Sequence, residues 1–166
     1  MDLVSLEEQV DREFATARRR AWLRKLGRLL FGKAGTGTLR SFEAVRRAVG
    51  AWGGVRRGRR TVQTARIVGS TGKNEWFDEE FMPLREASRE RWKRIDRAFR
   101  LGEELPPVSL YQLGGVYFVH DGHHRVSVAR FHGVEWMDAE VTEYWSPKGQ
   151  VAESTREHGA ATSPAR

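Results

Sequence analysis

Four of the five histidines in this chain lie within one short segment, residues 116–133. A β-branched and aromatic run stops there at Asp121-Gly122, and a helix-compatible run starts at His123. A strand that turns through Asp-Gly into a helix leaves the first backbone N–H groups of that helix without partners. These groups and the helix dipole favour an anion, and Arg125 adds a fixed positive charge. The segment therefore predicts a phosphate-binding turn.

Each residue of this turn has an expected role. The predicted phosphate-binding residues are Gly122, His123, His124, Arg125 and Ser127. His123 is also the predicted general acid or base, because the ordinary pKa of a histidine lies near neutrality. Asp121 is expected to cap the helix through its side chain, or to assist catalysis by holding a phosphate-bound Mg²⁺. A second wall of the site is expected from Ser70, Thr71 and Lys73 in a Gly-rich loop.

Two other interpretations of the histidines stay open. The side chains that could bind a divalent metal are His120, Asp121, His123 and His124. Imidazole and carboxylate groups suit zinc, iron or manganese, but neighbouring residues seldom converge on one ion, so no metal site is predicted. In the third interpretation the histidines simply open a helix, and Arg125 pairs with a carboxylate such as Glu140.

The elements that position the turn can be predicted from periodicity and turn residues. A β-hairpin is expected, with strands over 108–113 and 116–119 joined by Gly114-Gly115. After the turn, a helix from His123 to Gly133 leads to a last strand over 135–144. Upstream, a strand is expected over 62–68, and a helix of about 18 residues from Pro83 to Gly102.

The first 60 residues are expected to form a basic helical extension. Apolar residues at helical spacing predict one helix over 5–31, with Leu6, Val10, Phe14, Ala17 and Ala21 on one stripe. A shorter helix is expected after Ser41 as N-cap, with Trp52 on its apolar face. Residues 56–60, Arg-Arg-Gly-Arg-Arg, are expected to be a basic loop. The predicted division is a helical extension over 1–60, a main domain over 61–145 and a disordered tail over 146–166.

Charge is concentrated in this extension. From Arg12 to Arg60 there are fifteen Lys or Arg residues against only Glu13 and Glu43. Such a block suits a polyanionic partner, either DNA or, less favoured, an anionic membrane surface. Alternatively the apolar stripe packs on the main domain or on a second copy of the chain in a homodimer. The apolar residues expected to insert into a membrane are Trp22, Leu26, Leu29, Leu30 and Phe31.

Composition narrows the class of protein. The chain has 166 residues, of which 39% are hydrophobic, enough for one domain of ordinary size. It has no cysteine, which excludes disulfides, thiolate metal sites and thiol nucleophiles. No signal-peptide pattern and no apolar run near the roughly 20 residues of a membrane span are present. A cytoplasmic location is expected.

The hairpin and turn together resemble the ParB/sulfiredoxin superfamily. The resemblance rests on the segment Pro106 to Tyr111, the hairpin, and the run Tyr117 to Ala129, and it extends over about residues 61–144. It implies a small mixed sheet with packed helices, in an α/β (α+β) domain. Gly122-His123-His124-Arg125 is similar to the Gly-Glu-Arg-Arg element with which ParB proteins contact CTP. It is also similar to the Gly-Cys-His-Arg element with which sulfiredoxins bind ATP.

The resemblance implies a ParB-like nucleotide- or phosphate-binding module that is regulatory and DNA-associated. Bound CTP or ATP, with Mg²⁺, is the expected cofactor. His123 replaces the cysteine of sulfiredoxins, which excludes their sulfinic-acid chemistry, and it replaces the glutamate of ParB proteins. No helix-turn-helix follows the domain. The alternatives are a small NTPase or phosphotransferase of the same fold, or an adaptor protein with a vestigial site.

Overall fold

The computed structural model describes residues 3–31 and 37–147. The elements in chain order are α1 (Leu3–Phe31), β1 (Arg40–Ser41), α2 (Phe42–Val49), β2 (Trp52–Gln63), β3 (Ile67–Ser70), α3 (Arg89–Arg100), β4 (Val108–Leu113), β5 (Val116–Asp121), α4 (His123–Phe131) and β6 (Trp136–Trp145). The strands form one sheet in the order β1-β3-β5-β4-β6-β2. The pairs β5–β4 and β6–β2 are antiparallel and the other three are parallel. The predicted mixed α/β fold is confirmed.

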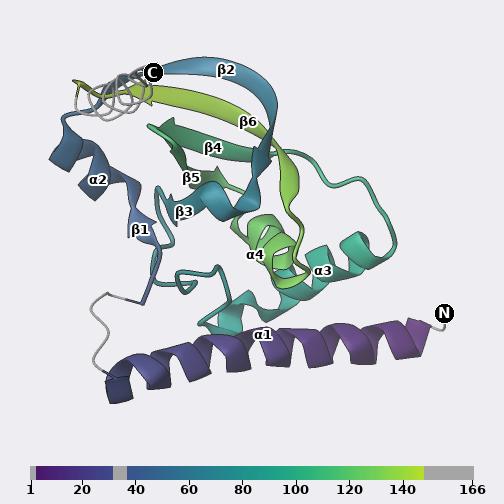
Figure 1. The fold of residues 1–166 in the computed structure, drawn as a ribbon. Helices are drawn as coiled ribbons and strands as arrows, with labels where there is room; N and C mark the ends of the chain where they lie inside the picture. Colours follow the sequence, from purple (N-terminus) through teal and green to yellow (C-terminus); the bar gives the residue numbers. More distant parts are fainter. Residues whose placement is uncertain (1–2, 32–36, 148–166) are drawn as a thin grey trace, which may run out of the picture.

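Helices cover the two faces of this sheet (Figure 1). Phe42 of α2 packs edge-on against Phe118 of β5, with ring centroids 5.4 Å apart. Leu110 and Val119 are buried in the other core cluster, which they share with Val126 of α4. Because side chains alternate along a strand, neighbouring residues of one strand supply the two cores. The predicted hairpin and the helix after it are confirmed.

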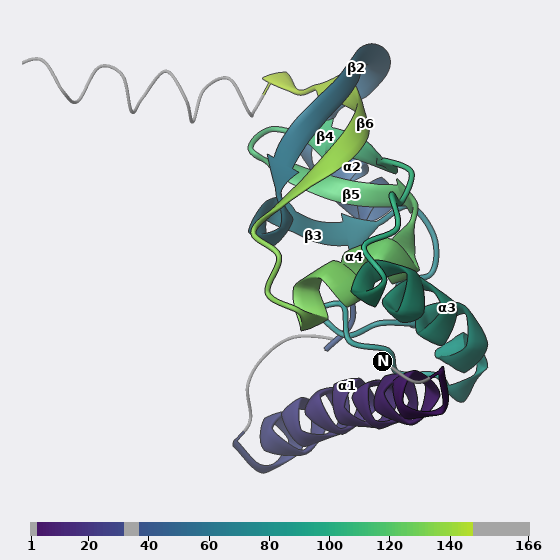
Figure 2. The same cartoon turned by 90° about the vertical axis from the view of Figure 1, so that its right-hand side faces the viewer.

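The helices α4, α3 and α1 follow one another below the sheet, with α3 between α4 and α1 (Figure 2). The stripe predicted for α1 is buried, and Phe14 packs on Trp92 of α3 with ring centroids 5.7 Å apart. Acidic residues near the start of α1 face cations of α3, as in the ion pair of 2.9 Å between Asp11 and Lys93. Further along α1, Arg24 donates to Asp78 and Arg28 donates to Glu79. The structural interpretation is therefore confirmed for the stripe from Leu6 to Ala21, which together with these arginines contacts the main domain.

The basic segment 56–60 is a strand, and the predicted loop is wrong. It belongs to β2, which pairs antiparallel with β6 from Trp52 to Gln63 and crosses the boundary predicted at residue 60. Strand pairing uses backbone groups, so an edge strand exposed on both faces accepts arginine and glycine as readily as apolar residues. Arg59 pairs with Asp138 of β6, and Arg57 pairs with Glu143 of β6. These ion pairs neutralise part of the positive charge of β2.

Three other boundaries also differ from the expectation. Trp52 starts β2 and does not belong to α2, although Ser41 caps α2 as predicted, accepting from the N–H of Ala44. The strand expected over 62–68 is divided by a 3-10 turn, Thr64–Arg66. The third helix begins at Arg89 after a second 3-10 turn, Glu86–Ser88, because Pro83 and Leu84 instead pair through their backbone with Phe77 and Trp76. The predicted tail lies, from residue 148 on, outside the described residues.

Gly69 of β3 is expected to be intolerant of any side chain. A Cβ at this position would lie 2.3 Å from the carbonyl oxygen of Arg40 in β1 and 2.5 Å from the ring of Phe118. We expect Gly69→Ala to lower the free energy of unfolding by about 3 kcal/mol, because backbone and a buried ring must both move. Gly72→Ala is the matched control, since a Cβ there meets nothing within 4 Å. Chemical denaturation measures both; equal stability of the two variants would contradict the close approach of β1.

Candidate functional site

Helix α4 begins with its backbone N–H groups uncapped by any side chain. Gly122, with φ 98° and ψ 24°, is the residue before the helix, and no side-chain hydrogen bond caps it. This left-handed conformation favours glycine. The predicted cap by Asp121 is wrong, because its carboxylate turns away and pairs with Arg125 at 2.8 Å. The turn therefore presents the positive end of the helix dipole with free donors, as the sequence predicted.

Arg125 is fixed by the protein itself. Its Nη1 donates to the carbonyl oxygens of Pro106 and Pro107 at 2.5 and 2.9 Å, and its Nη2 donates to Asp121 at 2.8 Å. It does not pair with Glu140, as the third interpretation had it. Since Nη1 and Nη2 are already bonded, Arg125 fastens the start of α4 to the segment before β4. Its charge still lies at the site, but its main contacts are structural.

His123 is buried behind the turn. Its Nε2 is hydrogen-bonded to Ser70 Oγ at 2.6 Å, and its ring stacks on Phe77. Ser70 Oγ also accepts from the N–H of Gly72, so its own proton can be donated to the imidazole. Burial, with a smaller contribution from Lys73, lowers the pKa of His123 to about 4. The ring is therefore neutral at pH 7.

His124 contacts the other edge of Phe77 and is equally buried. Burial, together with the charges of Arg91 and Lys73, lowers the pKa of His124 to about 4. Its Nε2 is inaccessible to solvent and has no hydrogen-bond partner. A buried polar atom in this state costs about 1–3 kcal/mol, which a small displacement toward an acceptor would recover.

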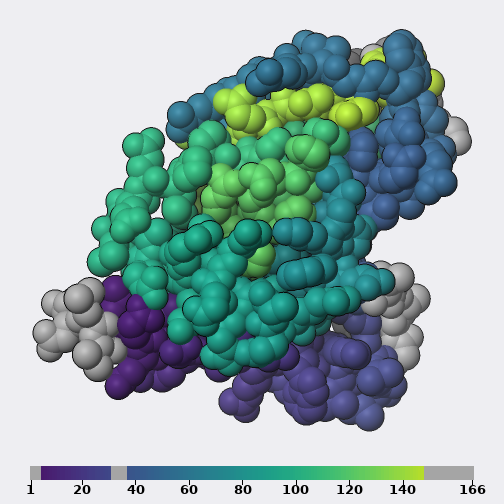
Figure 3. All heavy atoms as spheres, turned by 180° about the vertical axis from the view of Figure 1, so that it is seen from behind, coloured from purple at the N-terminus to yellow at the C-terminus, as the bar shows by residue number. Residues whose placement is uncertain are grey.

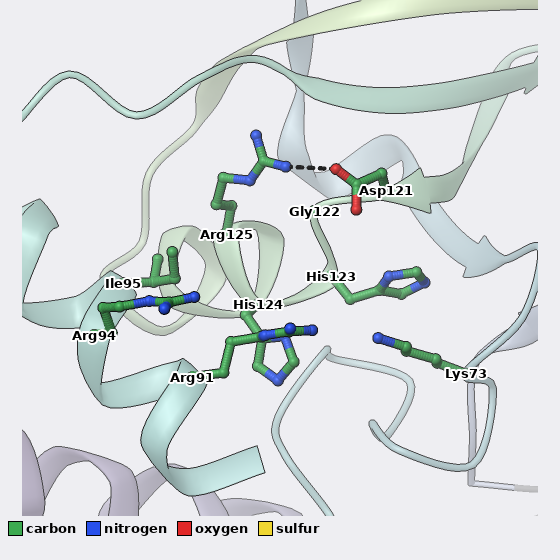
Figure 4. A pocket seen from close by; sticks show the side chains of 9 residues that line it. All are labelled: Lys73, Arg91, Arg94, Ile95, Asp121, Gly122, His123, His124 and Arg125. Carbon is green, nitrogen blue, oxygen red and sulfur yellow. Dashed lines mark hydrogen bonds and ion pairs between the residues drawn. The ribbon is translucent and has the colours of Figure 1, made fainter.

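These groups surround a pocket of about 230 Å³, which we call the α4 pocket (Figure 4). Its lining residues are Lys73, Arg91, Arg94, Ile95, Asp121, Gly122, His123, His124 and Arg125. In Figure 4, Lys73 reaches in from the loop after β3, opposite Arg91 of α3, whose guanidinium lies next to the His124 ring. Asp121 is the only carboxylate among the lining residues.

Three of the lining cations lack an acidic partner. Within residues 3–31 and 37–147, no carboxylate lies within ion-pair distance of Lys73, Arg91 or Arg94. Most other arginines of α1 and α3 are paired, as Arg97 is with Glu7 and Arg100 is with Glu13. A cluster of unpaired cations beside a helix N-terminus attracts an anion of high charge.

Two predicted site residues lie elsewhere. Ser127 is fully buried and accepts a hydrogen bond of 3.0 Å from the indole N–H of Trp92, so its hydroxyl faces the α3–α4 contact and not the α4 pocket. Thr71 lies outside the pocket lining, where its hydroxyl approaches His120 Nδ1 at 3.3 Å. Of the predicted second wall, Lys73 lines the pocket and Ser70 supports it through His123.

The histidines of the turn do not converge as metal ligands. In the described part of the chain, the one group of three side chains close enough to share an ion is Glu13, Asp96 and His132, between α1, α3 and α4. That group surrounds the guanidinium of Arg100, whose Nε lies 2.8 Å from Glu13 and 3.5 Å from Asp96. The positive charge of Arg100 thus already compensates the two carboxylates of this group.

Arg91 and Arg94 are the site residues that the sequence did not single out. No site role was predicted for either arginine. Their spacing of three residues places them on one side of α3. That signal marks a cationic helix face, but only the packing of α3 against α4 brings the face to the turn.

Comparisons with known proteins give one structural similarity. No protein-family model matches this chain, and no curated protein matches its sequence. The structure is similar to the crystal structure of sulfiredoxin from Arabidopsis thaliana, with a TM-score of 0.39 and 14% sequence identity. The similarity covers 60% of this chain and 94% of that chain. A similarity of this size says nothing of ligand or activity.

Proposed function

We propose that this chain is a nucleotide-binding module that holds the phosphates of its ligand in the α4 pocket. The observation that carries the proposal is the convergence of Lys73, Arg91 and Arg94, all without acidic partners, on the uncapped start of α4. Three cations and a helix N-terminus suit several phosphate groups better than a single one. The resemblance of the turn to the phosphate-binding elements of ParB proteins and sulfiredoxins supports a nucleotide, CTP or ATP, as the ligand.

The roles of the residues differ under this proposal. The backbone N–H groups after Gly122 and the side chains of Arg91 and Arg94 donate to phosphate oxygens. A small displacement of the His124 ring brings its buried Nε2, protonated in the neutral ring, to a phosphate oxygen, and this atom so finds its missing partner. Arg125 keeps the turn in place through its bonds to the carbonyls of Pro106 and Pro107.

Binding has more support than catalysis. A histidine with a pKa of about 4 is a weak base, and His123 already bonds to Ser70. Asp121 is the one lining carboxylate, and it could hold a Mg²⁺ that bridges phosphate oxygens. A small NTPase or phosphotransferase is the second candidate function, and this exposed carboxylate is the observation that favours it.

Titration calorimetry against CTP, ATP, ADP and GTP, with and without Mg²⁺, tests the proposal. We expect at least one triphosphate to bind with a Kd in about the micromolar range, and the diphosphate to bind more weakly because it offers fewer phosphate contacts. A phosphate-release assay under the same conditions separates binding from hydrolysis. Absence of heat with every nucleotide, and with inorganic pyrophosphate, would count against the proposal and favour an adaptor protein with a vestigial site.

Regulation, DNA association and homodimerisation stay predictions. The arginines of α1 that were expected to meet DNA include Arg18, Arg24 and Arg28, and each pairs with an acidic residue of the main domain. Their charges are therefore less available to phosphates than the sequence alone indicated.

A further inference from the structure

The last third of α1 carries a second apolar face. The stripe residues Leu6, Val10, Phe14, Ala17 and Ala21 of this helix are buried against the main domain. Beyond it, Trp22, Leu29 and Leu30 expose 59%, 75% and 68% of their surface. The residues Trp22, Leu23, Leu26, Leu29 and Leu30, which we call the outer face, fall on one side of the helix at 3.6 residues per turn. This side lies away from the one that carries Ala17 and Ala21.

The cations of this part of α1 divide between the two sides. Arg24 and Arg28 point to the main domain, where they donate to Asp78 and Glu79. Arg19 and Lys25 are exposed beside the outer face, and no carboxylate of the described residues pairs with them. The sequence holds no Asp or Glu from residue 14 to residue 42. The outer face is therefore apolar with a purely cationic border.

A groove continues the outer face toward the main domain. It encloses about 830 Å³ and is lined on the α1 side by Trp22, Lys25 and Leu29 and on the other side by Pro83 and Leu84. The charged lining residues are Arg18, Lys25, Arg28, Arg85 and Glu75. The space-filling view from behind shows α1 along the lower edge of the molecule, at the surface and away from the sheet (Figure 3). This placement lets one flat surface contact the outer face without touching the α4 pocket.

We propose that the outer face docks α1 on an anionic phospholipid bilayer, with its apolar residues inserted at the headgroup level. Exposed Trp and Leu beside Lys and Arg are what a surface-bound amphipathic helix requires. No described helix has a stretch long and apolar enough to cross a bilayer, so the helix lies in the plane of the surface. Two other occupants fit the outer face less well. A second copy of the chain would bring two faces with cationic borders together, and their like charges repel. The phosphate backbone of a nucleic acid would meet the cations but would leave the leucines uncovered.

Vesicle flotation with the full chain tests this inference. We expect binding to vesicles of phosphatidylcholine with 30% phosphatidylserine, and at least about tenfold weaker binding to phosphatidylcholine alone. The double variant Leu29→Glu/Leu30→Glu is expected to lose about tenfold or more in partitioning. Leu101→Glu is the matched control, because Leu101 is a leucine with 53% exposure on another helix end, and it should bind as wild type does.

Three results would overturn the inference. The first is equal flotation of wild type and the double variant, or no flotation of wild type with anionic vesicles. The second is a doubled mass in solution that the double variant reduces to a monomer, which would assign the face to a second copy. The third is binding to DNA that the double variant abolishes. Thermal melting of the variants checks that the exposed substitutions leave the fold intact.

Discussion

Removing Arg91 and Arg94 together is expected to weaken nucleoside triphosphate binding by about 100-fold or more. Neither arginine has an acidic partner among the described residues, and each would make charge-assisted hydrogen bonds worth about 1.5–3 kcal/mol to phosphate oxygens. Losing the hydrogen bonds of both arginines therefore raises Kd by about 100-fold or more. Calorimetry with the double variant Arg91→Ala/Arg94→Ala, at constant ionic strength, measures the change. The fold should be retained, because neither side chain makes an ion pair within the described protein.

Arg97→Ala provides the matched control for this experiment. Arg97 lies one turn further along α3 and pairs with Glu7 of α1, so it is outside the α4 pocket. The variant removes one positive charge from the same helix, where the double variant removes two, and its affinity should stay within about threefold of wild type. If both variants weaken binding equally, the effect is one of net charge and not of the pocket. Unchanged affinity of the double variant would place the phosphates elsewhere.

Stability is expected to fall steeply between pH 7 and pH 5. The pKa values of His123 and His124 are both lowered from 6.5 to about 4 in the folded protein. As the pH falls, the unfolded chain therefore takes up these two protons before the folded protein does. The contribution of the neutral rings to the free energy of unfolding is complete above pH 6.5 and is lost as the pH falls toward 4. Linkage gives a loss of about 2 kcal/mol for each ring at pH 5, or about 4 kcal/mol together.

Urea unfolding at a series of pH values measures this loss, and His124→Asn isolates one ring. The variant cannot take up the second proton, so its stability curve should fall by about half as much over the same range. At pH 7 the variant should be no more stable than wild type, because asparagine does not reproduce the contact of the His124 ring with Phe77. A wild-type curve that is flat from pH 7 to pH 5 would contradict the burial of two neutral rings.

Local sequence signals were sufficient to predict the turn at the centre of the site. Gly114-Gly115 and the alternating residues around it predict the hairpin, and Asp121-Gly122 predicts the turn before α4. These features depend on backbone geometry within a few residues of one another. The cap by Asp121 failed because its carboxylate had a stronger partner in Arg125, which is itself positioned by distant carbonyls.

The rest of the site depends on contacts that no local pattern encodes. Arg91 and Arg94 reach the turn only because Trp92, on the opposite side of α3, packs against Phe14 and bonds to Ser127. The same limit explains β2. Its arginines and glycines predict a loop, whereas its strand conformation comes from backbone pairing with β6 and needs little from its own side chains.

The order of the sheet has a consequence for synthesis of the chain. Strand β2 forms one edge of the sheet, and its partner β6 is the last element of the described residues, so a contact such as that of Arg59 with Asp138 joins residues 79 positions apart. At about 5–20 residues per second, a nascent β2 waits about 4–16 s for its partner. Charged side chains discourage an unpaired strand from associating with other chains. The arginines of β2 thus protect the growing polypeptide from aggregation before they meet the carboxylates of β6.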